Sequence, residues 1–158
     1  MKVLYTGSFD PITCGHLDLV KRCANKFDEV LVTVFNNSSK KYMFSKEERY
    51  ELVKGAVSEL KNVQVDVAEG LVVDYCRKNK INMVVRGLRA VSDYEYELSI
   101  SAINRHLNSE LETIFLVASS EYSFISSSMV KEVAGFNGNY KDLVPENVFN
   151  AIEKKLGR

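Results

Sequence analysis

The residues most able to do chemistry lie close together near the start of the chain, in the segment Thr6–His16. Two glycines in this segment, Gly7 and Gly15, would let the backbone approach a ligand closely. Gly15 and His16 fall where a helix is expected to begin, and the unpaired N–H groups of a helix start favour an anion. Neither a Walker A loop nor a G-x-G-x-x-G fingerprint occurs in the chain. We therefore predict a different kind of phosphate-binding turn, and the alternative is an ordinary turn with a capping histidine.

Three consecutive serines, Ser126, Ser127 and Ser128, form a second candidate phosphate site. They precede an expected helix, and serine is a favoured N-cap residue. Helix capping explains one of the three hydroxyls and leaves the other two without a role. A hydroxyl-rich anion site is the interpretation that uses all three.

Cationic side chains give a third signal, at Arg86 and Arg89 and more weakly at Lys40 and Lys41. Arg86 ends an apolar strand, where a charge is costly unless an anion meets it. The alternative is an ion pair between Arg86 and one of the glutamates in Tyr94–Glu97. A lysine pair in a loop is ordinarily no more than solvated surface.

Other polar and aromatic residues have an ordinary structural interpretation. Asp10 precedes Pro11 and is expected to form a turn rather than to bind a metal, since the sequence has no dense carboxylate cluster. His106 is expected at the surface or as a cap near the end of a helix. Tyr94 and Tyr96 are expected to be interface or core aromatics rather than a base-stacking platform.

The three cysteines have no C-x-x-C spacing, and their odd number indicates reduced thiols in a cytosolic protein. Cys23 and Cys76 are expected in the core. Cys14 lies inside the predicted phosphate-binding turn, and a helix start lowers the pKa of a thiol. An activated thiol at Cys14 is therefore an alternative to an inert one.

The composition is that of one globular domain, residues 1–158. Hydrophobic residues make up 46% of the chain and charged residues 27%, a balance that excludes a disordered protein. Basic and acidic residues number 21 each, which argues against a nucleic-acid or membrane partner. The apolar runs are too short to span a membrane, and from the apolar strand at the start of the sequence we expect no signal peptide. We expect a cytoplasmic location.

Alternating strands and helices must position these candidate groups. Continuous apolar strands are expected at Val3–Thr6, Glu29–Phe35, Val63–Val67, Met83–Arg86 and Thr113–Ala118. Helices are expected at Gly15–Phe27, Ser45–Val57, Leu71–Lys78, Ser92–Leu107, Ser127–Ala134 with Gly135 ending it, and from Pro145 to about Leu156. Capping boxes are expected from Ser45 with Glu48 and from Ser92 with Glu95. The alternation predicts an α/β fold: a single-domain, Rossmann-like, doubly wound five-stranded parallel sheet with helices on both faces.

In such a sheet, ligands bind beyond the carboxyl ends of the strands. The unusual polar residues of this chain follow the strands rather than precede them. They lie in the segments 6–16, 36–41, 68–72, 86–89 and 119–128. We therefore expect five strand ends to converge on one crevice rich in glycine, serine, lysine and arginine, a composition suited to a phosphate-bearing ligand.

Four strings in this order and spacing resemble the phosphopantetheine adenylyltransferase family, whose members carry a T/H-x-G-H nucleotidyltransferase signature. They are TGSFDPITCGH at 6–16, RGLRAVSDYEYE at 86–97, NRHL at 104–107 and FISSSMVKEVA at 124–134. The resemblance extends from Met1 to about Leu156. It implies transfer of the adenylyl group of ATP to 4′-phosphopantetheine, with Mg²⁺, in a homohexamer. It also implies dephospho-coenzyme A and pyrophosphate as products, with coenzyme A as a candidate inhibitor.

The resemblance assigns roles to matching positions. His16 would meet the ATP phosphates and stabilise charge at the α-phosphate in the transition state. The phosphopantetheine site would be lined by Ser8, Lys40, Val72 and Arg86. The ATP site would be formed by Ser8, Phe9, His16, Gly87, Leu88, Arg89, Glu97, Tyr122, Ser123, Phe124, Ile125, Ser126, Ser127 and Ser128. Ser8 stands where threonine is frequent, and Tyr122 stands where tryptophan is also seen.

Two other functions stay open from the sequence. One is a related nucleotidyltransferase that uses nicotinamide mononucleotide or a cytidyl donor, and the other is a noncatalytic nucleotide-binding module. His16, Lys40 and Arg86 together argue against the noncatalytic module. Adenylyl transfer would need charge neutralisation and alignment rather than a general base, because a phosphate monoester has a second pKa of about 6.

Overall fold

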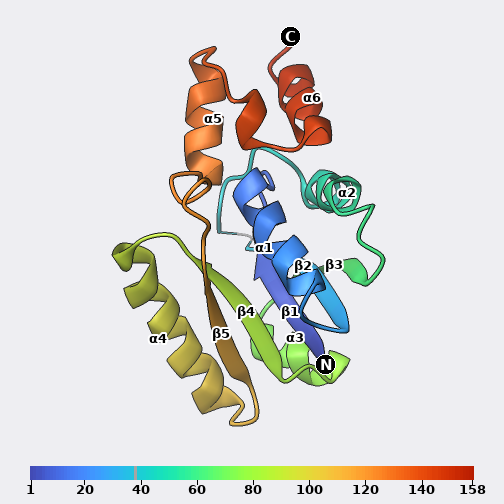
Figure 1. Ribbon diagram of the computed structural model, residues 1–158, viewed down its shortest axis with the longest axis vertical. Coiled ribbons are helices and arrows are strands. Elements are labelled where there is room, and N and C mark those ends of the chain that lie inside the picture. Colours follow the sequence, from blue (N-terminus) through green and yellow to red (C-terminus); the bar gives the residue numbers. More distant parts are fainter. Residues whose placement is uncertain (38) are drawn as a thin grey trace.

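The computed structural model describes residues 1–37 and 39–158 as an α/β fold built on one five-stranded sheet, as predicted. The strands are β1 (Lys2–Gly7), β2 (Glu29–Asn36), β3 (Val63–Glu69), β4 (Met83–Leu88) and β5 (Glu112–Val117). The helices are α1 (Cys14–Ala24), α2 (Lys46–Ala56), α3 (Val72–Asn79), α4 (Val91–Leu107), α5 (Ser127–Gly135) and α6 (Glu146–Lys155), with a 3₁₀ turn η1 (Lys141–Leu143). Figure 1 shows this order along the chain.

All strand pairs are parallel, and the strand order is β3-β2-β1-β4-β5. β1 lies at the centre, where Leu4 is opposite Leu31 of β2 on one side and Val84 of β4 on the other. The chain winds outward in one direction to β3 and then returns to the other side of β1 to form β4. The carboxyl ends of β1 and β4 therefore flank the point at which the winding reverses, where doubly wound sheets bind ligands.

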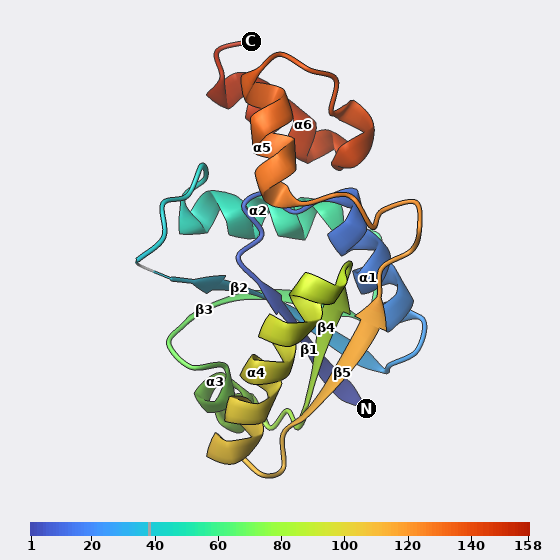
Figure 2. The same ribbon diagram turned by 90° about the vertical axis from the view of Figure 1, so that its left-hand side faces the viewer.

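Helices cover both faces of the sheet, as Figure 2 shows for α1 and α2 on one side and α3 and α4 on the other. Successive β1 side chains point to opposite faces, so Val3 and Tyr5 join one buried cluster and Leu4 joins the other. The larger cluster also contains residues of α1, α2, α5 and α6, and the smaller one contains Val73 and Cys76 of α3. This double layer fixes the strand ends on which the site is built.

The ends of α1 differ from the prediction. The helix begins at Cys14, with Thr13 as its N-cap, and ends at Ala24 rather than at Phe27. Phe27 continues the apolar periodicity because it packs on the larger cluster from the turn after the helix. The predicted capping box of Ser45 and Glu48 is confirmed.

The predicted capping box of Ser92 and Glu95 is wrong. α4 begins one residue earlier, after Ala90, which has no side-chain cap. The carboxylate of Asp93 instead accepts the backbone N–H of Arg89, so it satisfies a donor just before the helix. The carboxylate of Asp93 is thereby directed toward Arg89, one of the predicted site residues.

The end of α5 also differs from the prediction. Gly135 lies within the helix as its last residue, whereas the prediction placed it just after the helix. The left-handed conformation falls on Asn137, whose φ is 58°. The backbone N–H of Gly138 then closes the turn on the carbonyl of Val133 at 2.8 Å.

Candidate functional site

The carboxyl ends of the strands surround two cavities that share part of their walls. The large cavity has a volume of about 550 Å³ and lies over the segments that follow β1, β2, β4 and β5. The small cavity, of about 220 Å³, extends between the sheet and α4 and includes Val72 at the start of α3. Both cavities are lined by Thr6, Gly7, Ser8, Lys40, Arg86 and Glu97. The predicted convergence is confirmed for the segments after β1, β2, β4 and β5, whereas the predicted segment 68–72 contributes only Val72, to the small cavity.

The turn between β1 and α1 holds His16 in a fixed orientation. Thr13 Oγ1 accepts the backbone N–H of His16 at 3.3 Å, and the backbone N–H of Thr13 donates to His16 Nδ1 at 3.0 Å. The ring of Phe9 contacts the imidazole edge to face, with centroids 5.3 Å apart. Phe9 itself has a φ of 47°, a left-handed backbone that brings its ring under the turn.

His16 is neutral at pH 7. Burial lowers its pKa to about 4, and the positive charges of Arg89 and Arg86 act in the same direction. Because Nδ1 accepts a hydrogen bond from Thr13, the proton of the neutral ring lies on Nε2. The residue can therefore donate a hydrogen bond to a phosphate oxygen through Nε2. It is poorly suited to act as a general acid at neutral pH.

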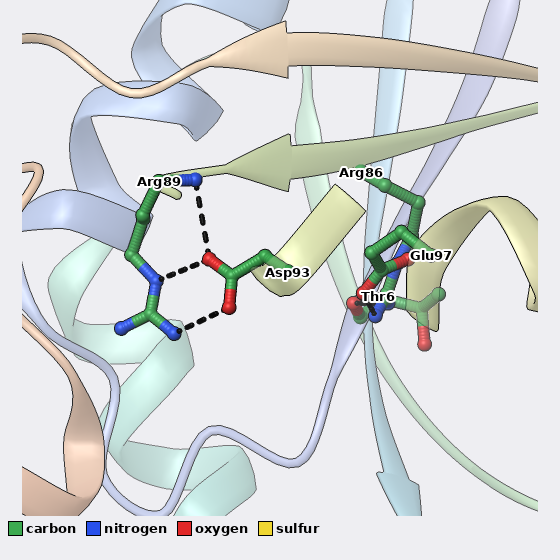
Figure 3. A network of polar contacts seen from close by, with 5 residues as sticks. All are labelled: Thr6, Arg86, Arg89, Asp93 and Glu97. Atoms are coloured by element: carbon green, nitrogen blue, oxygen red, sulfur yellow. Dashed lines mark hydrogen bonds and ion pairs between the residues drawn. The ribbon is translucent and has the colours of Figure 1, made fainter. Parts of the chain in front are cut away.

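Arg86 is paired with Glu97, so the ion-pair alternative raised by the sequence is correct for this residue. Its Nε and Nη2 donate to the two carboxylate oxygens of Glu97 at 2.7 and 2.6 Å, and its Nη1 donates to the carbonyl of Thr6 at 2.6 Å. Burial alone would lower the pKa of Arg86, but the hydrogen bonds and charge of Glu97 outweigh it and raise that pKa. Figure 3 shows the pair beside the backbone of Thr6.

Arg89 is paired with Asp93, which lies on the same helix as Glu97. Asp93 accepts from both the backbone N–H and the Nε of Arg89, at 3.2 Å each, and Arg89 Nη1 donates to the carbonyl of Ile125 at 2.9 Å. Asp93 and Glu97 are four residues apart, so one face of α4 orients both arginines (Figure 3). The two arginines line the large cavity with their side chains already oriented.

Asp10 has a larger role than the turn former predicted from the sequence. Its carboxylate is buried and accepts the backbone N–H groups of Met43 and Phe44, at 2.9 Å each. It also pairs with Lys131 Nζ at 2.8 Å. Asp10 therefore joins the turn after β1 to the segment after β2 and to α5. Sequence reasoning missed Lys131, which lines the large cavity and has no signal beyond its place in the serine-rich string.

The α5 start is tied to the same turn. Ser126 is the N-cap of α5 and accepts the backbone N–H of Met129 at 3.1 Å. The hydroxyl of Ser127 donates to the carbonyl of Pro11 at 2.8 Å, whereas Ser128 also lines the large cavity. Two of the three serines thus have a structural partner, and the start of the helix faces the cavity.

Most of the predicted site residues are brought together. The large cavity is lined by Ser8, Phe9, His16, Lys40, Arg86, Gly87, Arg89, Glu97, Tyr122, Ile125, Ser126, Ser127 and Ser128, and Val72 lines the small one. Leu88, Ser123 and Phe124 lie in the same segments but line neither cavity. Phe124 is 59% exposed. The walls also include Tyr42 and Lys41, of which only Lys41 had a weak sequence signal.

The cysteines are placed as the inert interpretation requires. Cys23 and Cys76 are buried in the two clusters, as expected. Cys14 is partly exposed, and burial raises the pKa of its thiol, which is the opposite of activation.

His106 is exposed in the last turn of α4, as expected. Tyr94 is exposed on α4 and contacts Phe115, so it is no core residue.

A doubly wound parallel sheet with a histidine at a helix start, oriented arginines and a serine-rich second helix start can bind a phosphate-bearing ligand at its strand ends. The chain belongs to the cytidylyltransferase-like family, whose model matches residues 4–133. The match covers β1 through most of α5 and so includes both helix starts and both arginines. Among the described residues, no helix combines the length and apolar character needed to cross a membrane.

Proposed function

We propose that this nucleotidyltransferase transfers the adenylyl group of ATP to 4′-phosphopantetheine and releases dephospho-coenzyme A and pyrophosphate. The observation that carries the proposal is the pair of adjoining cavities with a shared cationic wall. Ser8, Lys40 and Arg86 line both cavities, so a phosphate bound by them would lie where the large and the small cavity adjoin. An acceptor with a terminal phosphate and a long arm matches this arrangement.

The small cavity supports an acceptor arm of mixed polarity. Its walls combine the apolar side chains of Phe35, Val72 and Ile100 with the polar side chains of Ser101 and Asn104. A pantetheine arm has methyl, methylene and amide groups, and such a lining offers partners for each. ATP would occupy the large cavity, with its triphosphate between the start of α1 and the start of α5.

In this reaction an acceptor phosphate oxygen attacks the α-phosphorus of ATP in line, and the bond from the α-phosphorus to the bridging oxygen of the leaving pyrophosphate breaks. No covalent enzyme intermediate forms. The acceptor is largely dianionic at pH 7, so no general base is needed. Neutral His16 would donate through Nε2 to the α-phosphate, while Lys40 and Arg86 hold the acceptor phosphate and Arg89 meets the ATP phosphates.

ATP would enter as its magnesium complex, with phosphate oxygens and water as the ligands of Mg²⁺. The carboxylates that line the large cavity, Asp10, Asp93 and Glu97, are engaged by cationic side chains. We therefore assign no side chain of the described residues as a direct Mg²⁺ ligand.

We also propose a cytoplasmic homohexamer that coenzyme A inhibits by occupying the acceptor site. Exposed apolar side chains support assembly through α4 and β5. They are Val91, Tyr94, Tyr96, Leu98, Ile103 and Leu107 on α4, with Val117 on β5. Light scattering of the purified protein and inhibition assays with coenzyme A test these two points.

The decisive experiment is an assay of dephospho-coenzyme A formation with the wild type and His16→Ala. The variant should lower kcat by about 10²- to 10³-fold, because one preaimed donor to the developing charge is lost, while ATP affinity changes little. His106→Ala is the matched control, since His106 is the other histidine of the chain and lies outside both cavities. Near wild-type turnover in His16→Ala would refute the role of this residue.

Acceptor identity is tested separately. Nicotinamide mononucleotide in place of the acceptor, and CTP in place of ATP, should give no product with the wild-type enzyme. Lys40→Ala and Arg86→Ala should abolish calorimetric binding of 4′-phosphopantetheine, since each removes a cation from the shared wall. Unchanged affinity in both variants, or product from a rival substrate pair alone, would sink the assignment.

A further inference from the structure

Arg49 of α2 is a buried cation with no carboxylate partner among the described residues. Its side chain is fully buried, with an exposed fraction of 0%. Nη1 donates to the carbonyl of Ser8 at 2.8 Å, and Nη2 donates to Oδ1 of Asn36 at 2.5 Å. The guanidinium carbon lies 3.9 Å from the centroid of the Tyr42 ring, and Nε has no hydrogen-bond partner in the part of the chain that the structure describes.

Stability alone is a poor explanation for this arginine. A charge removed from water costs several kcal/mol, and a side chain with apolar atoms of similar volume often stabilises a protein as well or better. The unpartnered Nε adds a further cost. The useful property of Arg49 is therefore its planar fork, which reaches two acceptors on different segments at once.

The segments that Arg49 joins are two of those that form the shared wall, which also includes Arg86 of β4 and Glu97 of α4. Ser8 follows β1 and lines both cavities, and Asn36 ends β2. Tyr42 lies beyond Lys40 in the segment after β2, and its hydroxyl accepts the backbone N–H of Asn37 at 3.0 Å. Arg49 thus contacts Asn36 before Lys40 and Tyr42 after it.

We propose that Arg49 is a positioning residue for nucleotidyl transfer, which sets the distance between Ser8 and the segment that carries Lys40. It lines neither cavity, so it would act through these two neighbours rather than on a substrate. Loss of the fork would let the two sides of the shared wall move apart. The acceptor phosphate would then lose its alignment with the α-phosphorus, while His16 and the start of α5, to which Arg49 makes no hydrogen bond, stay in place.

The test compares Arg49→Met and Arg49→Lys with Lys54→Met. Lys54→Met is the matched control because it removes a positive charge from the exposed side of the same helix. Thermal unfolding is measured first, and Arg49→Lys carries the test if Arg49→Met fails to fold. Both Arg49 variants should lower kcat/KM for the acceptor by about 10- to 100-fold, the range that a small misplacement produces. ATP affinity, measured by calorimetry, should fall by much less, since Ser8 and Lys40 are only part of the ATP cavity.

Amide hydrogen exchange supplies a readout that does not depend on the acceptor. Exchange should rise in residues 39–44 and around Ser8 in both Arg49 variants and stay unchanged in Lys54→Met. Wild-type kinetics in the folded variants, or a parallel loss of ATP affinity and melting temperature, would overturn the positioning role. If the wild type makes no dephospho-coenzyme A, the proposed function fails on its own, and unchanged exchange in the Arg49 variants would still refute the inference.

Discussion

The stability of the protein should fall between pH 7.5 and pH 5 because of His16. The pKa of this residue is lowered from 6.5 to about 4 in the folded protein, mainly by burial. Between pH 6.5 and pH 4 the unfolded chain binds a proton at His16 and the folded chain does not. The contribution of the neutral ring is therefore complete above pH 6.5 and is lost as the pH falls toward 4.

The size of the effect follows from the same shift. At pH 5 the unfolded residue is roughly 1.5 pH units below its pKa, and each unit corresponds to about 1.36 kcal/mol, which gives about 2 kcal/mol. The ring of His16 is only partly buried, so we expect a measured loss of about 1 to 2 kcal/mol.

Urea unfolding at both pH values measures the loss, with His16→Gln as the matched variant. Glutamine at this third helical position can keep the capping box, since its side-chain oxygen can reach the backbone N–H of Thr13. Glutamine does not titrate, and the carboxylates elsewhere are the same in both proteins. The difference between the two proteins therefore isolates the titration of His16. A wild type that loses no more stability than His16→Gln on going to pH 5 would refute the reasoning.

Two further substitutions test the packing of the site. Glu97→Ala should lower the free energy of unfolding by about 2 kcal/mol, because Arg86 would keep only the carbonyl of Thr6; urea unfolding measures this, and equal stability would contradict the ion-pair role. Gly87→Ala should cost about 1 to 3 kcal/mol, because the new Cβ would overlap Cδ1 of buried Leu19; an unchanged melting temperature would show that Leu19 moves aside freely.

The sheet and the convergence of the strand ends could be predicted because their signals are local. Buried parallel strands appear as continuous apolar runs, and the polar segments after them must meet once the strands are parallel. The capping box of Ser45 was equally visible, since both partners lie within four residues. The start of α1 was predicted only to within one residue, since the helix begins at Cys14 rather than at Gly15.

Apart from the pairing of Arg86 with Glu97, which the sequence raised as an alternative, the partners within the site could not be predicted, because they depend on contacts between distant segments. Arg49 stands in a charged helix, and nothing in its neighbours distinguishes it from exposed Lys54. Its acceptors are supplied by residues 41 and 13 positions away in the sequence. The start of α4 was missed for a related reason: Asp93 is recruited by the arginine segment, so the serine nearby is not the cap.

The bonds of Asp10 have a consequence for the order in which this protein becomes functional. They span 33 and 34 residues to the segment after β2 but 121 residues to Lys131 of α5. Closing the longer loop costs more chain entropy, and contacts of long sequence separation form late. During synthesis, the first two bonds can form while α5 is still inside the ribosome. We therefore expect the contact of Asp10 with α5, which completes the wall of the large cavity, to form after its two bonds to the segment that follows β2.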